Sequence, residues 1–95
     1  MEFRWDFEWD DAKSESNRIE RDLPFDLAIK MFDGQTLEQL DARRDYQEVR
    51  VQAIGTVGSL ILLCVYTDRG AVRRIISLRP ANRRERDAYR AAFPG

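Results

Sequence analysis

Three short β-type segments between Glu48 and Arg79 constrain the fold of this 95-residue chain more than any other feature. Apolar side chains alternate over residues 49–54, the segment 60–67 is apolar up to its last residue, and residues 72–79 form a third such segment. Turn sequences separate them: Gly55-Thr56-Val57-Gly58 and Asp68-Arg69-Gly70. This spacing predicts an antiparallel meander whose middle strand is covered on both faces.

The N-terminal residues have the pattern of a strand followed by a surface helix. Aromatic side chains alternate with charged ones over residues 3–10, which predicts one half-buried strand or two short ones. A helix is then expected from Asp10 or Asp11, with a carboxylate as its N-cap, to about Arg21. Its thin packing stripe has three members: Ala12, Ser16 and Ile19.

A second helix is expected with Pro24 at its first position and its end at Asp33-Gly34. Its core face follows helical spacing and has four members: Phe25, Ala28, Ile29 and Phe32. Leu27 and Met31 form a second apolar ridge, which indicates either burial between layers or a surface for a partner. Residues 35–47 predict a loop, with a short strand or a helical turn as the alternative.

The C-terminal segment predicts a third helix. Pro80 ends the last strand, and Asn82 with Glu85 has the spacing of a capping box. This helix packs through Tyr89 and Phe93, and an arginine face points to solvent: Arg83, Arg86 and Arg90. Together the elements predict a single α+β domain, residues 1–95, with an antiparallel sheet of about four strands, two N-terminal helices and one C-terminal helix.

The formal net charge of −1 conceals a strong split of charge along the chain. Residues 1–48 carry 14 acidic and 7 basic side chains, whereas residues 49–95 carry 3 acidic side chains and 9 basic ones, all of them arginine. Such a basic half predicts contact with a polyanion, and arginine favours bidentate binding of phosphate. The alternative is a solvated basic face, or ion pairs with the acidic half.

Arg79 is the most attractive polyanion contact, because it ends the third strand beside the arginine helix. On that strand, however, both faces carry charged and apolar side chains. Periodicity therefore does not decide which face of residues 72–79 meets the core.

The absence of histidine and the single cysteine limit the chemistry that the chain can perform. A zinc site of ordinary ligands is excluded, and no histidine can activate a nucleophile. Cys64 lies inside the apolar run and is expected to be a buried, inert thiol. We expect no metal, cofactor or disulfide. A signal peptide is not recognisable, and the apolar run Leu60 to Tyr66 is too short to span a bilayer, so we expect a cytoplasmic protein.

Two separated motifs resemble those of one known family. Residues 9–17 read W-D-D-A-K-S-E-S-N, and Phe25 and Ala28 follow, as in the W-D-x-x-K-x-x-x-N…F-x-x-A opening of the BrnT toxins. Residues 65–79 and 83–89 resemble the V-Y-T-x-R-G…R-I-I-S-A-R…R-R-E-R…Y close of that family. The resemblance implies a small ribonuclease toxin of a type II toxin–antitoxin pair, with a RelE-like fold.

The chain departs from the family pattern in two places. The family usually reads K-H-G after the first helix, where this chain has Glu20-Arg21-Asp22, so the histidine and the glycine are missing. Residues 1–6 are expected to be an N-terminal extension, because Phe3-Arg4-Trp5-Asp6 repeats the pattern of Phe7-Glu8-Trp9-Asp10. Of the two copies, the second has Lys13 at the family spacing.

Metal-free RNA cleavage is chemically feasible for such a chain. The 2′-hydroxyl attacks the adjacent phosphate in line, and we expect Arg79 and Arg83 to stabilise the charge of the transition state. Lys13 and Glu85 are the side chains expected to supply base and acid, with Tyr66 available as a third or as a core aromatic. Four further side chains are expected to bind RNA: Asn17, Arg74, Arg86 and Arg90. One face of the first helix carries Lys13, Asn17 and Glu20. This face either closes one side of the RNA-binding groove or is simply solvated.

The resemblance also implies a partner. BrnT toxins are neutralised by a ribbon-helix-helix antitoxin, BrnA, which binds the DNA of the operon. We expect a complex with two copies of each chain, docked through Leu27, Met31 and the N-terminal strand, in which DNA is contacted through the antitoxin alone. No membrane partner is expected. The alternative function, favoured by the absent histidine, is a non-enzymatic binding module that keeps the fold and the antitoxin surface.

Overall fold

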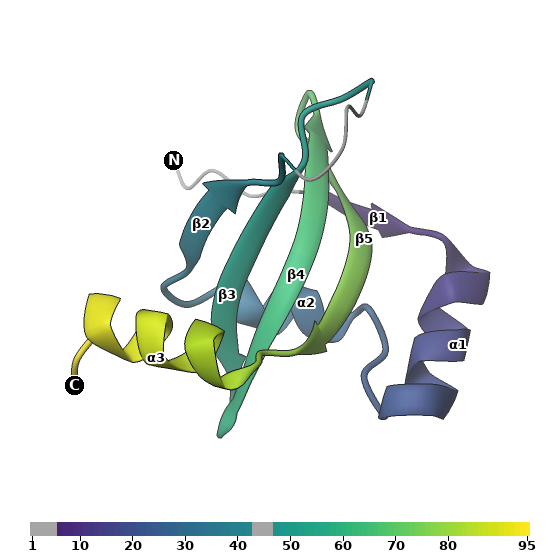
Figure 1. Cartoon of the computed structure of the whole chain (residues 1–95). Helices are drawn as coiled ribbons and strands as arrows, with labels where there is room; N and C mark the ends of the chain where they lie inside the picture. Colours follow the sequence, from purple (N-terminus) through teal and green to yellow (C-terminus); the bar gives the residue numbers. More distant parts are fainter. Residues whose placement is uncertain (1–5, 43–46) are drawn as a thin grey trace.

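A five-stranded sheet organises the residues that the computed structural model describes, 6–42 and 47–95 (Figure 1). Its strands are β1 Asp6–Trp9, β2 Leu37–Leu40, β3 Val51–Val57, β4 Leu60–Arg69 and β5 Val72–Pro80. They lie in the order β1-β5-β4-β3-β2. The pairs from β2 to β5 are antiparallel, whereas β1 lies parallel to β5. The sheet is therefore mixed and has five strands, which corrects the expectation of about four antiparallel ones.

The parallel pair explains this difference. The strand over the first residues is confirmed for β1, and residues 1–5, where the extension and the first half of the alternation were expected, lie outside the described residues. A parallel pair needs a long crossover instead of a tight turn, so no local signal marks the partner of β1. β2 is the short strand that was one of the alternatives for residues 35–47.

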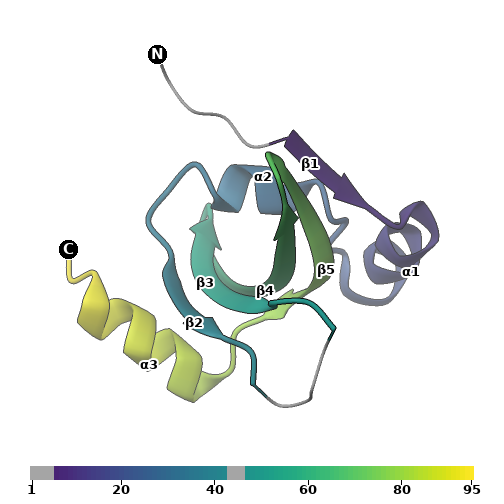
Figure 2. The same ribbon diagram turned by 90° about the horizontal axis from the view of Figure 1, so that it is seen from above.

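The described parts of the chain have three helices, which pack on or beside the sheet: α1 Asp11–Arg21, α2 Leu27–Met31 and α3 Arg83–Ala92. The sheet curls around α2, while α3 lies against the outer face and α1 lies beyond the edge formed by β1 and β5 (Figure 2). The inner core contains Leu23, Phe25, Ala28, Met31, Ala53, Leu62, Cys64, Tyr66, Ile75 and Leu78. The outer core under α3 contains Ile54, Leu63, Val65, Ala81 and Tyr89. Strand β4 contributes to both cores, so the prediction of a middle strand covered on both faces is confirmed.

Helix α2 is shorter than expected, and its buried residues are Ala28 and Met31. It begins at Leu27, so Pro24 precedes it. Met31 is 0% exposed, and Leu27 is partly buried against the same core. Of the two interpretations of this ridge, burial between layers is therefore confirmed for Met31, and an exposed surface for a partner is wrong. Ile29, expected in the core, is instead 40% exposed. The sheet curls around this short helix, so side chains on two of its sides meet strands.

The meander of β3, β4 and β5 is confirmed, with a correction at its first turn. Gly58 (φ 60°) and Ser59 alone form that turn, so Gly55 lies inside β3. A Cβ atom at Gly55 would lie 2.6 Å from Met31 Cγ. Glycine at this position lets the strand approach α2 closely.

Helix α1 begins and ends as predicted. Asp10 caps it, with Oδ1 accepting hydrogen bonds from the backbone N–H groups of Ala12 and Lys13 at 2.9 and 3.2 Å. The helix ends at Arg21, and Asp22 follows in the left-handed conformation (φ 58°, ψ 32°). Asp22 stands where the K-H-G motif has glycine, which adopts this conformation without steric cost.

Asp22→Gly is expected to raise the free energy of unfolding by about 0.5–1 kcal/mol. A left-handed conformation costs an L-residue roughly 1–2 kcal/mol, and the freedom of glycine in the unfolded chain offsets part of the gain. Chemical denaturation measures the difference. Asp22→Ala is the matched control: it removes the carboxylate but keeps Cβ, so no such gain is expected. A glycine variant less stable than the parent would contradict the strain argument.

The packing of α1 differs from the predicted stripe. Ile19 is 69% exposed, and the other two members of that stripe are exposed as well. Polar contacts hold the helix instead. Ser14 Oγ accepts a hydrogen bond from the Phe25 backbone N–H at 2.9 Å, and Asn17 reaches β5. Within the described residues, no helix is long and apolar enough to cross a membrane.

Candidate active site

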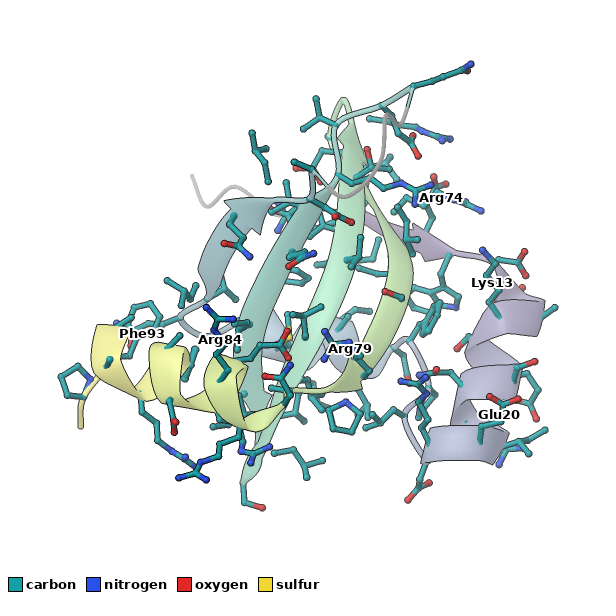
Figure 3. All side chains as sticks on the ribbon, viewed as in Figure 1. Lys13, Glu20, Arg74, Arg79, Arg84 and Phe93 are labelled. Atoms are coloured by element: carbon teal, nitrogen blue, oxygen red, sulfur yellow. The ribbon has the colours of Figure 1, made fainter. Side chains whose placement is uncertain are left out.

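A pocket of about 450 Å³ lies between α1 and the C-terminal half of β5 (Figure 3). Helix α1 contributes Lys13, Asn17 and Glu20, and β5 contributes Ser77 and Arg79. The spacing that was predicted to place three α1 residues on one side of a groove therefore does so. Lys13, Asn17 and Arg79 come from distant parts of the sequence and meet in one pocket.

Asn17 builds the junction between the two walls. Its Nδ2 donates to the backbone oxygens of Leu23 at 2.6 Å and Leu78 at 2.9 Å. Strand β1 pairs with β5 only as far as Ile75. Beyond that point the Asn17 amide, and not β1, donates a hydrogen bond to the β5 backbone. Both amide hydrogens are thereby used, and what Asn17 has left is an acceptor, which a phosphate oxygen cannot use. Asn17 therefore joins the two walls of the pocket through both hydrogens of its amide.

Lys13 and Glu20 supply the free charges of the α1 wall. Both side chains are exposed, and within residues 6–42 and 47–95 no carboxylate forms an ion pair with Lys13. Asp10 lines the same pocket but is occupied as the helix cap. Glu20 lies two helical turns from Lys13, about 10 Å along the axis. The pocket therefore has the Lys13 cation toward one end and the Glu20 carboxylate, followed by Arg21, toward the other.

Arg79 and Glu85, both expected in the catalytic machinery, form a bidentate ion pair. Arg79 Nη1 lies 2.8 Å from Glu85 Oε1, and Nη2 lies 2.9 Å from Oε2. Glu85 also completes the predicted capping box of α3, with Asn82 as its partner at 2.8 Å in both directions. The hydrogen bonds from Arg79 hold the pKa of Glu85 below its ordinary value, and the Asn82 backbone N–H acts in the same direction. Glu85 is thus a carboxylate fixed from two sides.

The ion pair leaves Arg79 able to bind an anion. A guanidinium has two bidentate edges, and Glu85 occupies the one formed by Nη1 and Nη2. Nε and the second hydrogen of Nη2 form the other edge. Because Arg79 lines the pocket and its side chain is 36% exposed, this second edge is available to a phosphate.

The other predicted arginines lie outside this pocket: Arg74, Arg83, Arg86 and Arg90. Arg86 is half-buried, and its Nη1 donates to the backbone oxygen of Ala81 at 2.7 Å. This bond ties α3 to the short segment that joins it to β5. Arg74 Nη1 lies 3.5 Å from Glu8 Oε1 on β1. The remaining two are exposed on α3.

Tyr66, Tyr89 and Cys64 are core residues. The Tyr66 hydroxyl donates to the Glu38 carboxylate on the inner face, and burial, followed by this hydrogen bond, raises the pKa of Tyr66. The Tyr89 hydroxyl donates to the backbone oxygen of Gln35 at 2.9 Å. The prediction of a buried thiol is confirmed for Cys64, and burial raises the pKa of that thiol to about 12.

The pocket also has polar residues that were not among the predicted site residues, and two of them are Arg21 and Ser77. Arg21 stands where the family motif has histidine, so this signal was present in the sequence. Ser77 lies two residues before Arg79 in the same motif and on the same strand face. Among the described residues, no three His, Cys, Asp or Glu side chains are grouped to hold a metal ion.

A comparison with known protein families gives a match over most of the chain. The sequence model of a family described as "Ribonuclease toxin, BrnT, of type II toxin-antitoxin system" matches residues 9–85. The matched region begins at the strand before α1 and ends at Glu85, so it includes both walls of the pocket. A search of curated proteins found no match.

Proposed function

Because the chain belongs to the BrnT family of ribonuclease toxins of type II toxin–antitoxin systems, we propose that it is an endoribonuclease that cleaves messenger RNA at the pocket between α1 and β5. The observation that carries this proposal is the meeting of Lys13 and Arg79 in one pocket. The proposal includes a single domain over residues 1–95 with a RelE-like fold, acting in the cytoplasm, where messenger RNA is translated.

The proposed reaction is in-line attack of a 2′-hydroxyl on the neighbouring phosphate. Arg79 binds that phosphate through its Nε/Nη2 edge and stabilises the additional negative charge of the transition state. Glu85 keeps the guanidinium in this orientation and acts as a positioning residue, which replaces the acid–base role expected from the sequence. Tyr66 takes no part, because its hydroxyl lies on the inner face against Glu38.

The proton transfers are assigned to the two free groups on α1. Glu20 takes the proton of the 2′-hydroxyl, and the Lys13 ammonium donates to the leaving 5′-oxygen. Their separation of about 10 Å along the helix axis places them toward opposite ends of the phosphate that lies between them. No step requires a metal ion. The arginines of α3, led by Arg83, attract the RNA backbone toward the pocket.

The proposed partner is a BrnA-like ribbon-helix-helix antitoxin, in a complex with two copies of each chain, and operator DNA is contacted through the antitoxin. Burial of Met31 removes the surface that the sequence suggested for this contact. The antitoxin must block access to Arg79 in order to silence the toxin. We therefore place its contact over the pocket or over α3, on the outer face of the sheet.

A non-enzymatic binding module is the second candidate function, and one observation favours it. Arg21 lines the pocket at the position of the family histidine. An arginine stays protonated at physiological pH and cannot transfer protons as histidine does. In this second function the pocket binds RNA or the antitoxin without cleaving.

Cleavage of a single-stranded RNA by the purified chain is expected in EDTA as well as without it, and Lys13→Ala is expected to slow it by roughly 10- to 100-fold. Products are separated on denaturing gels and tested for 2′,3′-cyclic phosphate ends. Lys30→Ala, an exposed lysine on α2, is the matched control and is expected to leave the rate unchanged. Loss of activity in EDTA with rescue by magnesium would overturn the metal-free mechanism. A folded chain that binds RNA but never cleaves it would support the binding module.

A further inference from the structure

A second pocket, of about 480 Å³, lies where β2 and β3 meet α3. Gln39 and Gln52 line it from the strands, and Arg84 lines it from the helix. Figure 3 shows Arg84 on α3. Glu85 lines it as well, while its ion-pair partner Arg79 lines the pocket beside α1. The Arg79–Glu85 pair is therefore the boundary that the two pockets share. A ligand held at Arg79 can extend directly into the second pocket.

The two glutamines present an unused donor and an unused acceptor side by side. They are opposite each other across β2 and β3, and Gln39 Nε2 donates to Gln52 Oε1 at 3.2 Å. This bond leaves Gln39 Oε1 free to accept and Gln52 Nε2 free to donate. Exchanging the oxygen and nitrogen of both amides gives the same outcome, one donor beside one acceptor. Every nucleobase carries an adjacent donor and acceptor on an edge that is open in single-stranded RNA, and the order and position of the two groups differ from base to base.

The remaining surface of the pocket suits the flat face of a base. Leu37, Ile54 and Leu63 form an aliphatic floor, and Ala88 of α3 adds to it. Arg84 is exposed at the rim and has no carboxylate partner among the described residues. A guanidinium plane in this position can stack on a base or bind the phosphate that follows it. An apolar floor with a few polar groups at its edge is typical of a site for a small planar ligand.

We propose that this second pocket is the base-recognition subsite of the enzyme, and that it receives the nucleobase next to the phosphate held at Arg79. The inference rests on the proposed function and adds to it the origin of sequence preference. Contacts to phosphate fix the register of an RNA without reading it, whereas contacts to base edges discriminate between sequences. Gln39 and Gln52 are therefore specificity residues, and Arg79 is not.

The test compares binding of four 2′-fluoro homopolymers, of adenine, cytosine, guanine and uracil, which lack the attacking hydroxyl. Fluorescence anisotropy is expected to show a spread of about 10-fold or more between the best and the weakest homopolymer, since a good base contact discriminates by about 1–3 kcal/mol. The double variant Gln39→Leu/Gln52→Leu is expected to reduce this spread to about 2-fold. Its mean affinity should change little, because phosphate contacts dominate affinity.

Gln35→Leu is the matched control, because it makes the same chemical change at an exposed residue outside the pocket. It is expected to keep the wild-type spread. If the double variant fails to fold, Gln52→Glu replaces the free donor with an acceptor and is expected to change which homopolymer binds best. Equal binding of all four by the parent chain, or an unchanged spread in the double variant, would overturn the subsite. A subsite that fails while ordinary RNA is still cleaved leaves the proposed function standing, whereas a parent chain that neither binds nor cleaves RNA refutes both.

Discussion

Replacing Arg79 with alanine is expected to lower the rate of RNA cleavage by on the order of 100-fold or more. Arg79 offers a bidentate edge to the phosphate in the pocket, and its contact strengthens as negative charge develops in the transition state. An interaction of this kind affects kcat as strongly as kcat/KM. Single-turnover cleavage of a labelled RNA measures the effect, with enzyme in excess so that binding does not limit the rate.

Two further arginine variants make this result specific. Arg79→Lys keeps the charge but not the two-atom edge, so most of the loss is expected to remain. Arg69→Ala removes an arginine that is 60% exposed and pairs with Glu48, and it is expected to cleave at the parent rate. If Arg79→Ala is folded and retains full activity, this guanidinium is outside the active site and the pocket beside α1 has been assigned wrongly.

Met31→Glu is expected to unfold the chain, with a loss of more than about 4 kcal/mol in the free energy of unfolding. Met31 is completely buried, and its side chain packs over Gly55 of β3. A carboxylate there would lose its hydration without gaining a partner. Such a loss approaches the whole stability of a domain of this size. Circular dichroism with urea titration measures it directly.

An exposed position on the same helix provides the control for the substitution of Met31. Ile29→Glu introduces the same carboxylate two residues earlier on α2, where the side chain is 40% exposed. Its cost is expected to remain below about 1 kcal/mol. A stable, folded Met31→Glu variant would restore the interpretation of Met31 as part of a docking surface.

The sequence was least informative at β5, and the structure gives the physical reason. The pairing with β4 shifts between Val65 and Tyr66, whose partners on β5 are Ser77 and Ile75. Ile76 is thus an additional residue in a β-bulge, and the alternation of faces changes phase there. Ile75 and Leu78 both face the inner core although they are three positions apart, a spacing that would put them on opposite faces of a regular strand. No fixed period of two could have described this strand.

The bulge also explains why Arg73 and Arg79 lie on opposite faces of the sheet. Arg73 is 8% exposed and makes a bidentate contact with Asp68 at 2.9 and 3.0 Å. Its guanidinium carbon lies 3.9 Å from the centre of the Tyr66 ring. After the bulge, Arg79 shares the outer face with its cross-strand partner Leu63. One strand therefore supplies a structural arginine to one face and a site arginine to the other.

The helices with clear capping signals were predicted well, and the packing of α1 was not. Asp10 and Asn82 are caps that depend on local sequence, so they could be identified without a structure. The contacts of Asn17 depend on the distant backbone of Leu78, which no local pattern reveals. Lys13 and Arg79 were assigned to one site through the family resemblance, and the residues alone did not place them together.

The parallel pairing of β1 with β5 has a consequence for the order in which this protein is made. Synthesis proceeds from the N-terminus, so β1 and α1 leave the ribosome before any residue of β5 has been joined to the chain. Contacts between segments so distant in sequence form late in folding. The pocket between α1 and β5 therefore stays incomplete while the meander is translated. A pocket built in this way cannot act on any RNA until β5 has been translated and has paired with β1.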